Sequence, residues 1–278
     1  MRLGGPIPAP EQQTPAAWIE AHRARGYRAA YCPLPIGAPD ALIADYRTAA
    51  ADADLVIAEV GAWSSPVSLD PQTRAEALDK CKGALRLAEA IGARCSVNVV
   101  GSVGSKWDGP DPRDLLPETV DRIIDTLREI IDAVNPVQTK WAIEMMPWML
   151  PDSPDSYLEL IARVDREAMA VHLDPVNIIN SPTRFYDTGA VIRECFTKLG
   201  PQIVSCHAKD ITLGQSLTVQ LDECCPGTGG LDYPTYMHEL DRLSSDVPLM
   251  LEHLPDQDAY AAAAAHIRSV AAAEGITL

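Results

Sequence analysis

Two stretches decide the fold of this 278-residue chain: WAIEMM at residues 141–146 and MAVHLD at residues 169–174. Each is a short apolar run, and each carries an acidic residue, Glu144 or Asp174, in its second half. A helical stretch that begins near Ser153 separates the two runs. Because strand, helix and strand in this order form a βαβ unit, the two runs predict neighbouring strands of a parallel sheet.

The same alternation extends in both directions along the chain. Six further apolar runs predict strands, at residues 2–4, 29–35, 55–63, 94–102, 203–210 and 248–254. Helical stretches occupy residues 15–25, 40–53, 71–91 and 117–134 and begin again near residues 153, 187, 233 and 256. Eight β/α repeats predict that residues 1–278 form one (β/α)₈ TIM barrel, a fold of about 250 residues.

An open, doubly wound parallel sheet is the alternative architecture. It usually has fewer strands, and a Gly-rich turn after its first strand opens a helix that holds a pyrophosphate. Here Gly4 and Gly5 lead into PIPAP, which is unsuited to that task. The longest predicted loops follow the fourth, sixth and seventh strands, at the end where β/α barrels place their active sites. They are residues 101–117, 180–187 and 211–231.

The composition disfavours a nucleic-acid partner, is compatible with a small neutral sugar and indicates a reducing compartment. The formal charge is −16, whereas proteins that grip nucleic acid carry basic stripes, so we expect no nucleic-acid partner. No run of about 18 apolar residues predicts a membrane span, and residues 1–10 lack the apolar segment of a signal peptide. The seven cysteines are scattered except for Cys224 and Cys225, which is typical of reduced thiols and indicates the cytoplasm.

The last four predicted strands each bring a polar side chain to the carboxyl end of the barrel: Glu144, Asp174, His207 and Glu252. A single Glu at a strand end is more often a salt-bridge partner, but four successive strands with such residues point to one site. Burying three carboxylates and an imidazole together without a cation costs roughly several kcal/mol. We therefore expect one divalent ion, with Mn²⁺ favoured by the mostly oxygen ligands and Mg²⁺, Co²⁺ and Zn²⁺ as alternatives.

Five motifs carry a resemblance to a known family: IEMMPW (143–148), VHLDPVN (171–177), SCHAKD (205–210), PGTGGLDY (226–233) and LEHL (251–254). With them the chain resembles the sugar phosphate isomerase/epimerase superfamily of xylose isomerase-like TIM barrels, which includes ketose 3-epimerases and endonuclease IV. The resemblance implies that Glu144, Asp174, His207 and Glu252 bind the metal. It also implies that Glu144 and Glu252 exchange substrate protons.

The chain departs from the ketose epimerases at two positions. Those enzymes resemble one another in a His three residues after the strand-six Asp, where this chain has Asn177. They also carry an Arg shortly after the strand-seven His, whereas His207 is followed here by Lys209 and Asp210. These differences bear on the substrate rather than on the metal. Six histidines in total and the negative charge argue against the three-zinc endonuclease branch.

Six further residues are candidates for binding the substrate. Lys209 should share the interior face with His207 and meet a substrate oxygen, or else pair with Asp210 or Glu223. His172 lies one layer below Asp174 and has a core hydrogen-bonding role as its alternative. Asn98 and Glu59 lie at or near strand ends, where each could line the pocket. His253 follows Glu252 directly and should point in the opposite direction, toward the helices. The six candidates are Asn98, Trp107, Trp148, His172, Asn177 and Lys209.

The favoured function is a metal-dependent sugar isomerase or epimerase that removes a proton beside a carbonyl and passes through an enediolate. The first alternative is a lyase or deglycosidase that releases the aglycone of a 3-keto sugar glycoside by β-elimination. A phosphoester hydrolase and a catalytically inactive sugar-binding barrel are the others, and the presence of both Glu144 and Glu252 speaks against the last. The expected partner is a small carbohydrate, and assembly into a homo-oligomer is left open.

Overall fold

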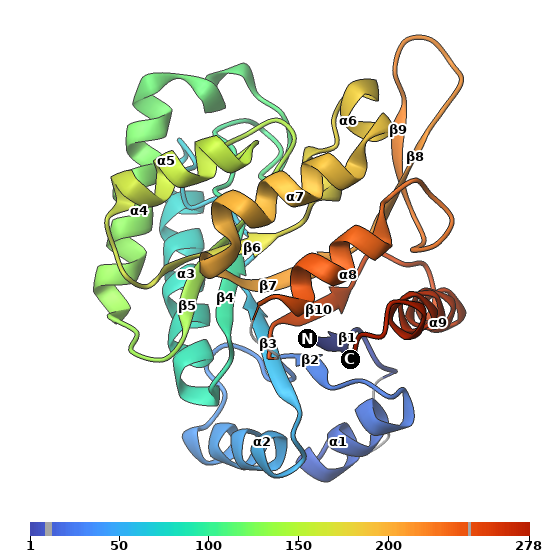
Figure 1. The fold of residues 1–278 in the computed structure, drawn as a ribbon. Coiled ribbons are helices and arrows are strands. Elements are labelled where there is room, and N and C mark those ends of the chain that lie inside the picture. The colour runs from blue at the N-terminus through green and yellow to red at the C-terminus, as the bar shows by residue number, and fades with distance from the viewer. Residues whose placement is uncertain (9–12, 244–245) are drawn as a thin grey trace.

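The eight predicted strands close into one parallel barrel (Figure 1). The structure, a computed structural model, describes residues 1–8, 13–243 and 246–278. Hydrogen-bonded neighbours follow the order β1-β10-β7-β6-β5-β4-β3-β2, and every pair is parallel, which confirms the predicted (β/α)₈ barrel. The strands are β1 (Arg2–Gly4), β2 (Ala29–Tyr31), β3 (Val56–Gly61), β4 (Cys95–Asn98), β5 (Lys140–Glu144), β6 (Met169–Leu173), β7 (Ile203–Ala208) and β10 (Pro248–Leu251).

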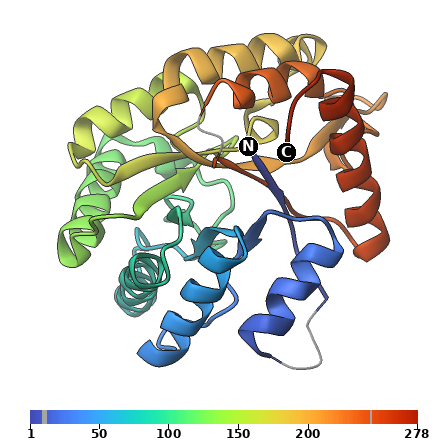
Figure 2. The ribbon, with the colours of Figure 1, turned by 60° about the horizontal axis from the view of Figure 1, so that its bottom comes forward.

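Helices surround the barrel, and the two chain ends lie side by side at its lower end (Figures 1 and 2). Thr14 caps the first helix by accepting the Ala17 N–H at 3.2 Å, and Gly92 ends the third with φ 78°, both as predicted. Among the described helices, none combines the length and the apolar character that crossing a bilayer requires. The helices are α1 (Pro15–Ala24), α2 (Asp40–Asp52), α3 (Pro71–Ile91), α4 (Pro117–Val134), α5 (Pro154–Val164), α6 (Pro182–Tyr186), α7 (Thr188–Leu199), α8 (Tyr233–Asp241) and α9 (Gln257–Ala273), with 3₁₀ turns η1 (Pro112–Leu115), η2 (Val176–Ile178) and η3 (Gly200–Gln202).

The strands enclose an interior that is separate from the main core between sheet and helices. Two small apolar clusters made of strand residues lie apart from the main core: Ala29, Ala58 and Met250 form one, and Cys95, Val97 and Ala142 form the other. The pairing register shifts within β2–β3 and within β6–β7. Such irregularities re-aim side chains and are common beside active sites.

All three predicted long loops contain regular structure: η1 lies within 101–117, α6 lies within 180–187, and a hairpin lies within 211–231. Residues 211–231 were expected to be loop, but β8 (Asp210–Leu213) and β9 (Leu221–Cys224) pair antiparallel and project from the upper end of the barrel (Figure 1). The two short strands lie outside the barrel, and Ile211 is their one buried apolar residue, so they lack the apolar runs that identify the barrel strands. Leu217, at the tip, is 97% exposed.

The buried carboxylate of Asp210 binds the backbone of the segment that follows this hairpin. Asp210 accepts backbone N–H groups of Ile211, Gly227, Gly229 and Leu231 at 2.8–2.9 Å. Four donors satisfy both oxygens of a side chain that is only 1% exposed. Asp210 therefore holds the PGTGGLDY segment at the end of the barrel. This structural role explains the buried carboxylate, and no catalytic role is needed to explain it.

Candidate metal centre

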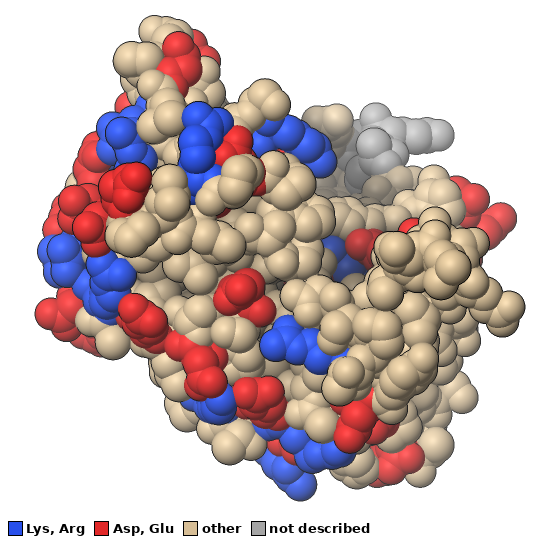
Figure 3. Space-filling model, turned by 90° about the horizontal axis from the view of Figure 1, so that it is seen from above, with Lys and Arg blue, Asp and Glu red and all other residues tan. Residues whose placement is uncertain are grey.

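Four neighbouring strands deliver the predicted metal-binding side chains to one place. Glu144 is the last residue of β5, Asp174 directly follows β6, His207 lies near the end of β7, and Glu252 directly follows β10. These strands are consecutive in the barrel order β10-β7-β6-β5. Because the strands are parallel, their carboxyl ends share the upper end of the barrel, where the surface is hollowed and charged side chains are visible inside the hollow (Figure 3).

The four side chains converge closely. One donor atom from each lies within 4.8 Å of the donor atoms of all the others. His207 Nδ1 lies 2.9 Å from Glu252 Oε1, 3.2 Å from Glu144 Oε1 and 3.7 Å from Asp174 Oδ2. Asp174 and His207 are fully buried, while Glu144 and Glu252 retain a little exposure toward the mouth. The four polar residues predicted from the ends of the strands therefore lie together in the structure.

Lys209 sits among the same carboxylates. Its Nζ lies 2.6 Å from Glu252 Oε1, 2.9 Å from Asp174 Oδ2 and 3.5 Å from Glu223 Oε2, and the residue is 3% exposed. Burial alone would lower the pKa of Lys209, but Asp174 and Glu144 outweigh it and raise that pKa well above its usual value. The ammonium is therefore a permanent positive charge at the edge of the cluster.

Lys209 and His207 favour the ionised form of the Asp174 and Glu252 carboxylates. Burial works to raise the pKa of Glu252, yet His207 and Lys209 bring it down to about 2. Burial would lower the pKa of His207, but Glu252 and Glu144 raise it well above its usual value. The pKa of Asp174 is also held below its usual range, where Lys209 and His207 overcome the effect of burial.

Two oxygens in the cluster, Asp174 Oδ2 and Glu252 Oε1, form ion pairs with Lys209 but no hydrogen bond of good geometry within the described ranges. The other Asp174 oxygen, Oδ1, accepts the N–H groups of Val176 and Asn177 at 3.0 and 3.4 Å, which fixes the carboxylate with Oδ2 pointing into the cluster. Asp174 Oδ2 and Glu252 Oε1 therefore both point into the cluster, where they could coordinate a cation. Three carboxylates and one imidazole around a single point are a donor set that fits a divalent ion.

Asn177 belongs to this cluster. Its Nδ2 donates to Glu144 Oε1 and to the Met145 carbonyl, both at 3.0 Å, and its Oδ1 lies 3.4 Å from Lys209 Nζ. The Asn177 amide therefore orients the Glu144 carboxylate and connects it to the Lys209 ammonium. The residue that departs from the His expected by resemblance to the ketose epimerases, Asn177, thus contacts Glu144 and Lys209.

Two of the predicted substrate-binding residues lie away from the mouth. Asn98 faces α3: its amide pairs with the Ser64 backbone N–H and carbonyl at 3.2 and 3.1 Å and donates to Cys81 Sγ. Cys95 and Val97 take the interior face of β4, so the alternation of side chains sends Asn98 outward. His172 is fully buried beneath His207, with the ring centroids 4.1 Å apart. The structure supports the core alternative for His172.

The two tryptophans lie in the loops after β4 and β5. Trp107 is 37% exposed and Trp148 is 39% exposed, and Trp148 Nε1 donates to the Asp108 carbonyl at 2.9 Å. This hydrogen bond joins the two loops at the upper end of the barrel. Partly exposed indole faces in these loops remain available to pack on a sugar ring.

Two residues near the site differ from the sequence-based expectation: Tyr31 was not identified from the sequence, and the direction expected for His253 is wrong. Tyr31 donates to the Leu251 carbonyl at 3.1 Å, next to Glu252, and only its position at the end of β2 hints at this contact. His253 was expected to face the helices but has φ 58° and pairs with Glu223 of β9 at 3.2 Å. The left-handed turn at His253 ends the strand alternation, which is why the expected direction is wrong.

Comparison with known proteins places the chain in a family. The family model described as xylose isomerase-like TIM barrel matches residues 19–270. None of the curated proteins compared with the chain is similar enough to match.

Solved structures of similar fold cover almost the whole chain. A xylose isomerase-like TIM barrel protein from Mycobacterium smegmatis, in complex with magnesium, is 17% identical with a TM-score of 0.66, covering 97% of this chain and 95% of its own. D-psicose 3-epimerase from Clostridium cellulolyticum H10 is 14% identical with a TM-score of 0.69, covering 100% of both chains. The 3-keto-D-glucoside 4-epimerase YcjR from E. coli is 13% identical with a TM-score of 0.71, covering 97% and 99%. The chain belongs to the family of xylose isomerase-like TIM barrels.

Proposed function

We propose that the protein is a divalent-metal-dependent sugar isomerase or epimerase that moves a proton on a carbon beside a carbonyl. The observation that carries this proposal is the convergence of two glutamates on one nitrogen: Glu252 Oε1 and Glu144 Oε1 lie 2.9 and 3.2 Å from His207 Nδ1. The glutamates come from β5 and from the end of β10, which β6 and β7 separate. The two carboxylates therefore approach one small volume from two sides. Moving a proton from one face of a substrate carbon to the other requires such an arrangement.

The four residues Glu144, Asp174, His207 and Glu252 would hold the metal ion, and we favour Mn²⁺. When bound there, a divalent ion supplies Lewis-acid polarisation of a substrate carbonyl oxygen. Mostly oxygen donors favour Mn²⁺, Mg²⁺ or Co²⁺ over metals that prefer thiolates. A relative of this fold was solved with magnesium, which supports the choice of a divalent ion.

The chain's own groups divide the work of proton transfer. One of Glu144 and Glu252 removes the proton beside the carbonyl, and the other returns it, on the opposite face for epimerisation or at the neighbouring carbon for isomerisation. Asn177, bonded to Glu144 Oε1, keeps that base in position. The Lys209 ammonium stabilises negative charge as it develops on a substrate oxygen, since it is preorganised and buried.

The expected substrate is a small carbohydrate rather than a nucleic acid. Similar folds include D-psicose 3-epimerase, L-ribulose 3-epimerase and 3-keto-D-glucoside 4-epimerase, which act on sugars. Endonuclease IV from Thermus thermophilus also shares the fold, but the charge of −16 disfavours a polyanionic partner. All seven cysteines are free, which supports a reducing compartment, and we place the enzyme in the cytoplasm.

Elimination from the same enolate is the second candidate function. A probable 3-DHS dehydratase from Bacillus anthracis shares the fold with a TM-score of 0.65, covering 92% of each chain. In that case one glutamate removes the proton and a β-substituent, such as the aglycone of a 3-keto glycoside, leaves instead of the proton returning.

Incubation in D₂O tests proton transfer directly. We expect the Mn²⁺-loaded protein, given a panel of ketoses and 3-keto sugars, to place deuterium on the carbon beside the carbonyl of the sugar that it converts. Mass spectrometry and NMR of the sugar, after removal of the protein by filtration, measure the label. Boiled protein and metal-free protein serve as controls.

Three outcomes of this incubation separate the mechanisms. Label together with an altered configuration or a moved carbonyl supports the proposal. Release of an aglycone with formation of an enone assigns elimination. Conversion without any solvent deuterium indicates a hydride shift and contradicts the two-glutamate mechanism.

A further inference from the structure

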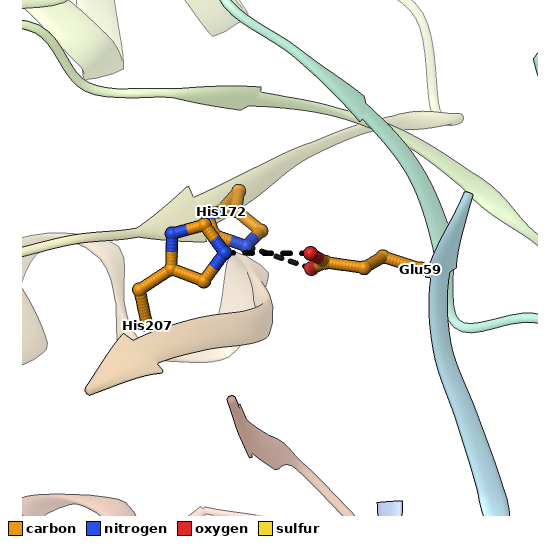
Figure 4. Close-up of side chains that lie close together, drawn as sticks. All are labelled: Glu59, His172 and His207. Atoms are coloured by element: carbon orange, nitrogen blue, oxygen red, sulfur yellow. Dashed lines mark hydrogen bonds and ion pairs between the residues drawn. The ribbon is translucent and has the colours of Figure 1, made fainter. Parts of the chain in front are cut away.

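A second buried cluster lies directly beneath the metal centre. Glu59 of β3 reaches across the barrel interior to His172 of β6 and His207 of β7 (Figure 4). The residue is only 2% exposed and carries a charge that no arginine or lysine neutralises among the described contacts. A buried carboxylate of this kind persists only if hydrogen-bond donors or positive charge surround it.

Three donors surround the Glu59 carboxylate. Oε2 lies 2.9 Å from His172 Nε2 and 3.1 Å from Ser205 Oγ, which donates to it. Oε1 lies 3.3 Å from His207 Nε2. Two ring nitrogens and one hydroxyl thus converge on the two oxygens of one carboxylate. The separations of 2.9 and 3.3 Å fit an N–H donor on each imidazole.

The remaining nitrogen of each ring supports this assignment. His172 Nδ1 has no hydrogen-bond partner in the described part of the chain, and an unpaired buried lone pair costs less than an unpaired N–H. The contact with Glu59 thus assigns an N–H to His172 Nε2. His207 has its Nδ1 turned toward Glu144 and Glu252, on the side opposite to Glu59.

We propose that Glu59 is a positioning residue that holds the His207 proton on Nε2 and leaves Nδ1 directed at the metal centre. The inference rests on the proposed metal-binding role of His207. A carboxylate behind a metal-bound histidine fixes the ring and its tautomer and increases the basicity of the donor nitrogen. The register shift between Ala30 and Tyr31 pairs Tyr31 with Glu59 and gives Glu59 its place in this arrangement.

Glu59→Gln tests the role with little change in shape. The amide has no negative charge and one oxygen in place of two, so it satisfies fewer donors and no longer increases the basicity of His207. We expect the dissociation constant for Mn²⁺, measured by titration calorimetry, to rise about 10- to 100-fold. Ser205→Ala is the matched control, because it removes a donor from Glu59 Oε2 and leaves the contact between Oε1 and His207; here we expect a change within about threefold.

A spectroscopic readout separates positioning from a merely structural role. In protein labelled with ¹⁵N-histidine, we expect a slowly exchanging Nε2–H signal from His207, with and without Mg²⁺, assigned by its absence in His207→Asn. This signal should exchange rapidly or disappear in Glu59→Gln and persist in Ser205→Ala. Circular dichroism and thermal unfolding check that each variant is folded.

The outcomes distinguish this inference from the proposed function. If wild-type protein binds no metal but the His207 signal depends on Glu59, the metal proposal fails and the positioning role stands. If folded Glu59→Gln binds Mn²⁺ like wild type and keeps the signal, the positioning role is wrong. Two ions per wild-type chain, with one lost in Glu59→Gln, would instead make Glu59, His172 and His207 a second metal site and overturn the inference.

Discussion

Replacing Glu144 or Glu252 by Gln is expected to lower kcat about 10²-fold or more while most of the metal stays bound. Gln keeps the shape of the side chain and one oxygen for the ion but removes the base that accepts the substrate proton. The two variants should also differ from each other. A variant that retains one base should still exchange deuterium on one face of the substrate while failing to complete the conversion, which assigns each glutamate to its face.

Glu239→Gln provides the matched control for these variants. Glu239 lies on α8, pairs with Arg242 at 2.7 Å and has no contact with the metal centre, so we expect unchanged kcat. Steady-state rates and bound metal are measured on the same preparations. Wild-type kcat in either active-site variant would remove that glutamate from the mechanism, and loss of metal in parallel with activity would assign it to binding alone.

Lys209→Met is expected to destabilise the metal-free protein by about 3–5 kcal/mol, because it removes one partner of a buried ion cluster. Its ammonium lies within 3 Å of both Asp174 and Glu252, so these carboxylates would lose a close cationic partner and keep imidazole neighbours, His207 for both and His253 for Glu252. Bound Mn²⁺ replaces the missing charge, and the difference from wild type should shrink. The variant should also bind Mn²⁺ more tightly, since the ion no longer meets a positive charge beside two of its ligands.

Urea unfolding with and without Mn²⁺ measures both effects. Lys198→Met is the control: Lys198 pairs with Asp155 and Glu194 on the surface of α7, where we expect a loss of at most about 1 kcal/mol. A Lys209→Met protein that folds only when Mn²⁺ is present agrees with the account. A metal-free variant that loses no more stability than Lys198→Met contradicts the assignment of Lys209 as counter-charge.

The sequence was sufficient to predict the barrel and the polar cluster because both depend on strand order. Eight apolar runs alternate with helices, and parallel strands must present their carboxyl ends together. Glu144, Asp174, His207 and Glu252 lie at those ends, so no knowledge of the loops was needed to bring them together. The structure confirms the fold and the proximity of the four side chains.

The positions of the remaining residues depend on structural details that the order of the strands does not determine. Asn98 lies at a strand end like the others, but only the inward positions of Cys95 and Val97 reveal that it faces α3. Glu59 is placed by a register shift, which interrupts the simple pairing of strand residues. The hairpin β8–β9 buries one apolar side chain of its strands, Ile211, in the core, so hydrophobic periodicity gives little signal for it.

Metal stoichiometry tests the central claim most directly. Protein purified without chelator is analysed for its elements, stripped with EDTA, reloaded with Mn²⁺ and analysed again, with Asp174→Ala and His207→Ala beside it. We expect one divalent ion per wild-type chain, loss of activity on stripping, recovery with Mn²⁺, and occupancy well below one in both variants. A wild-type protein that is active without any divalent ion would contradict the account.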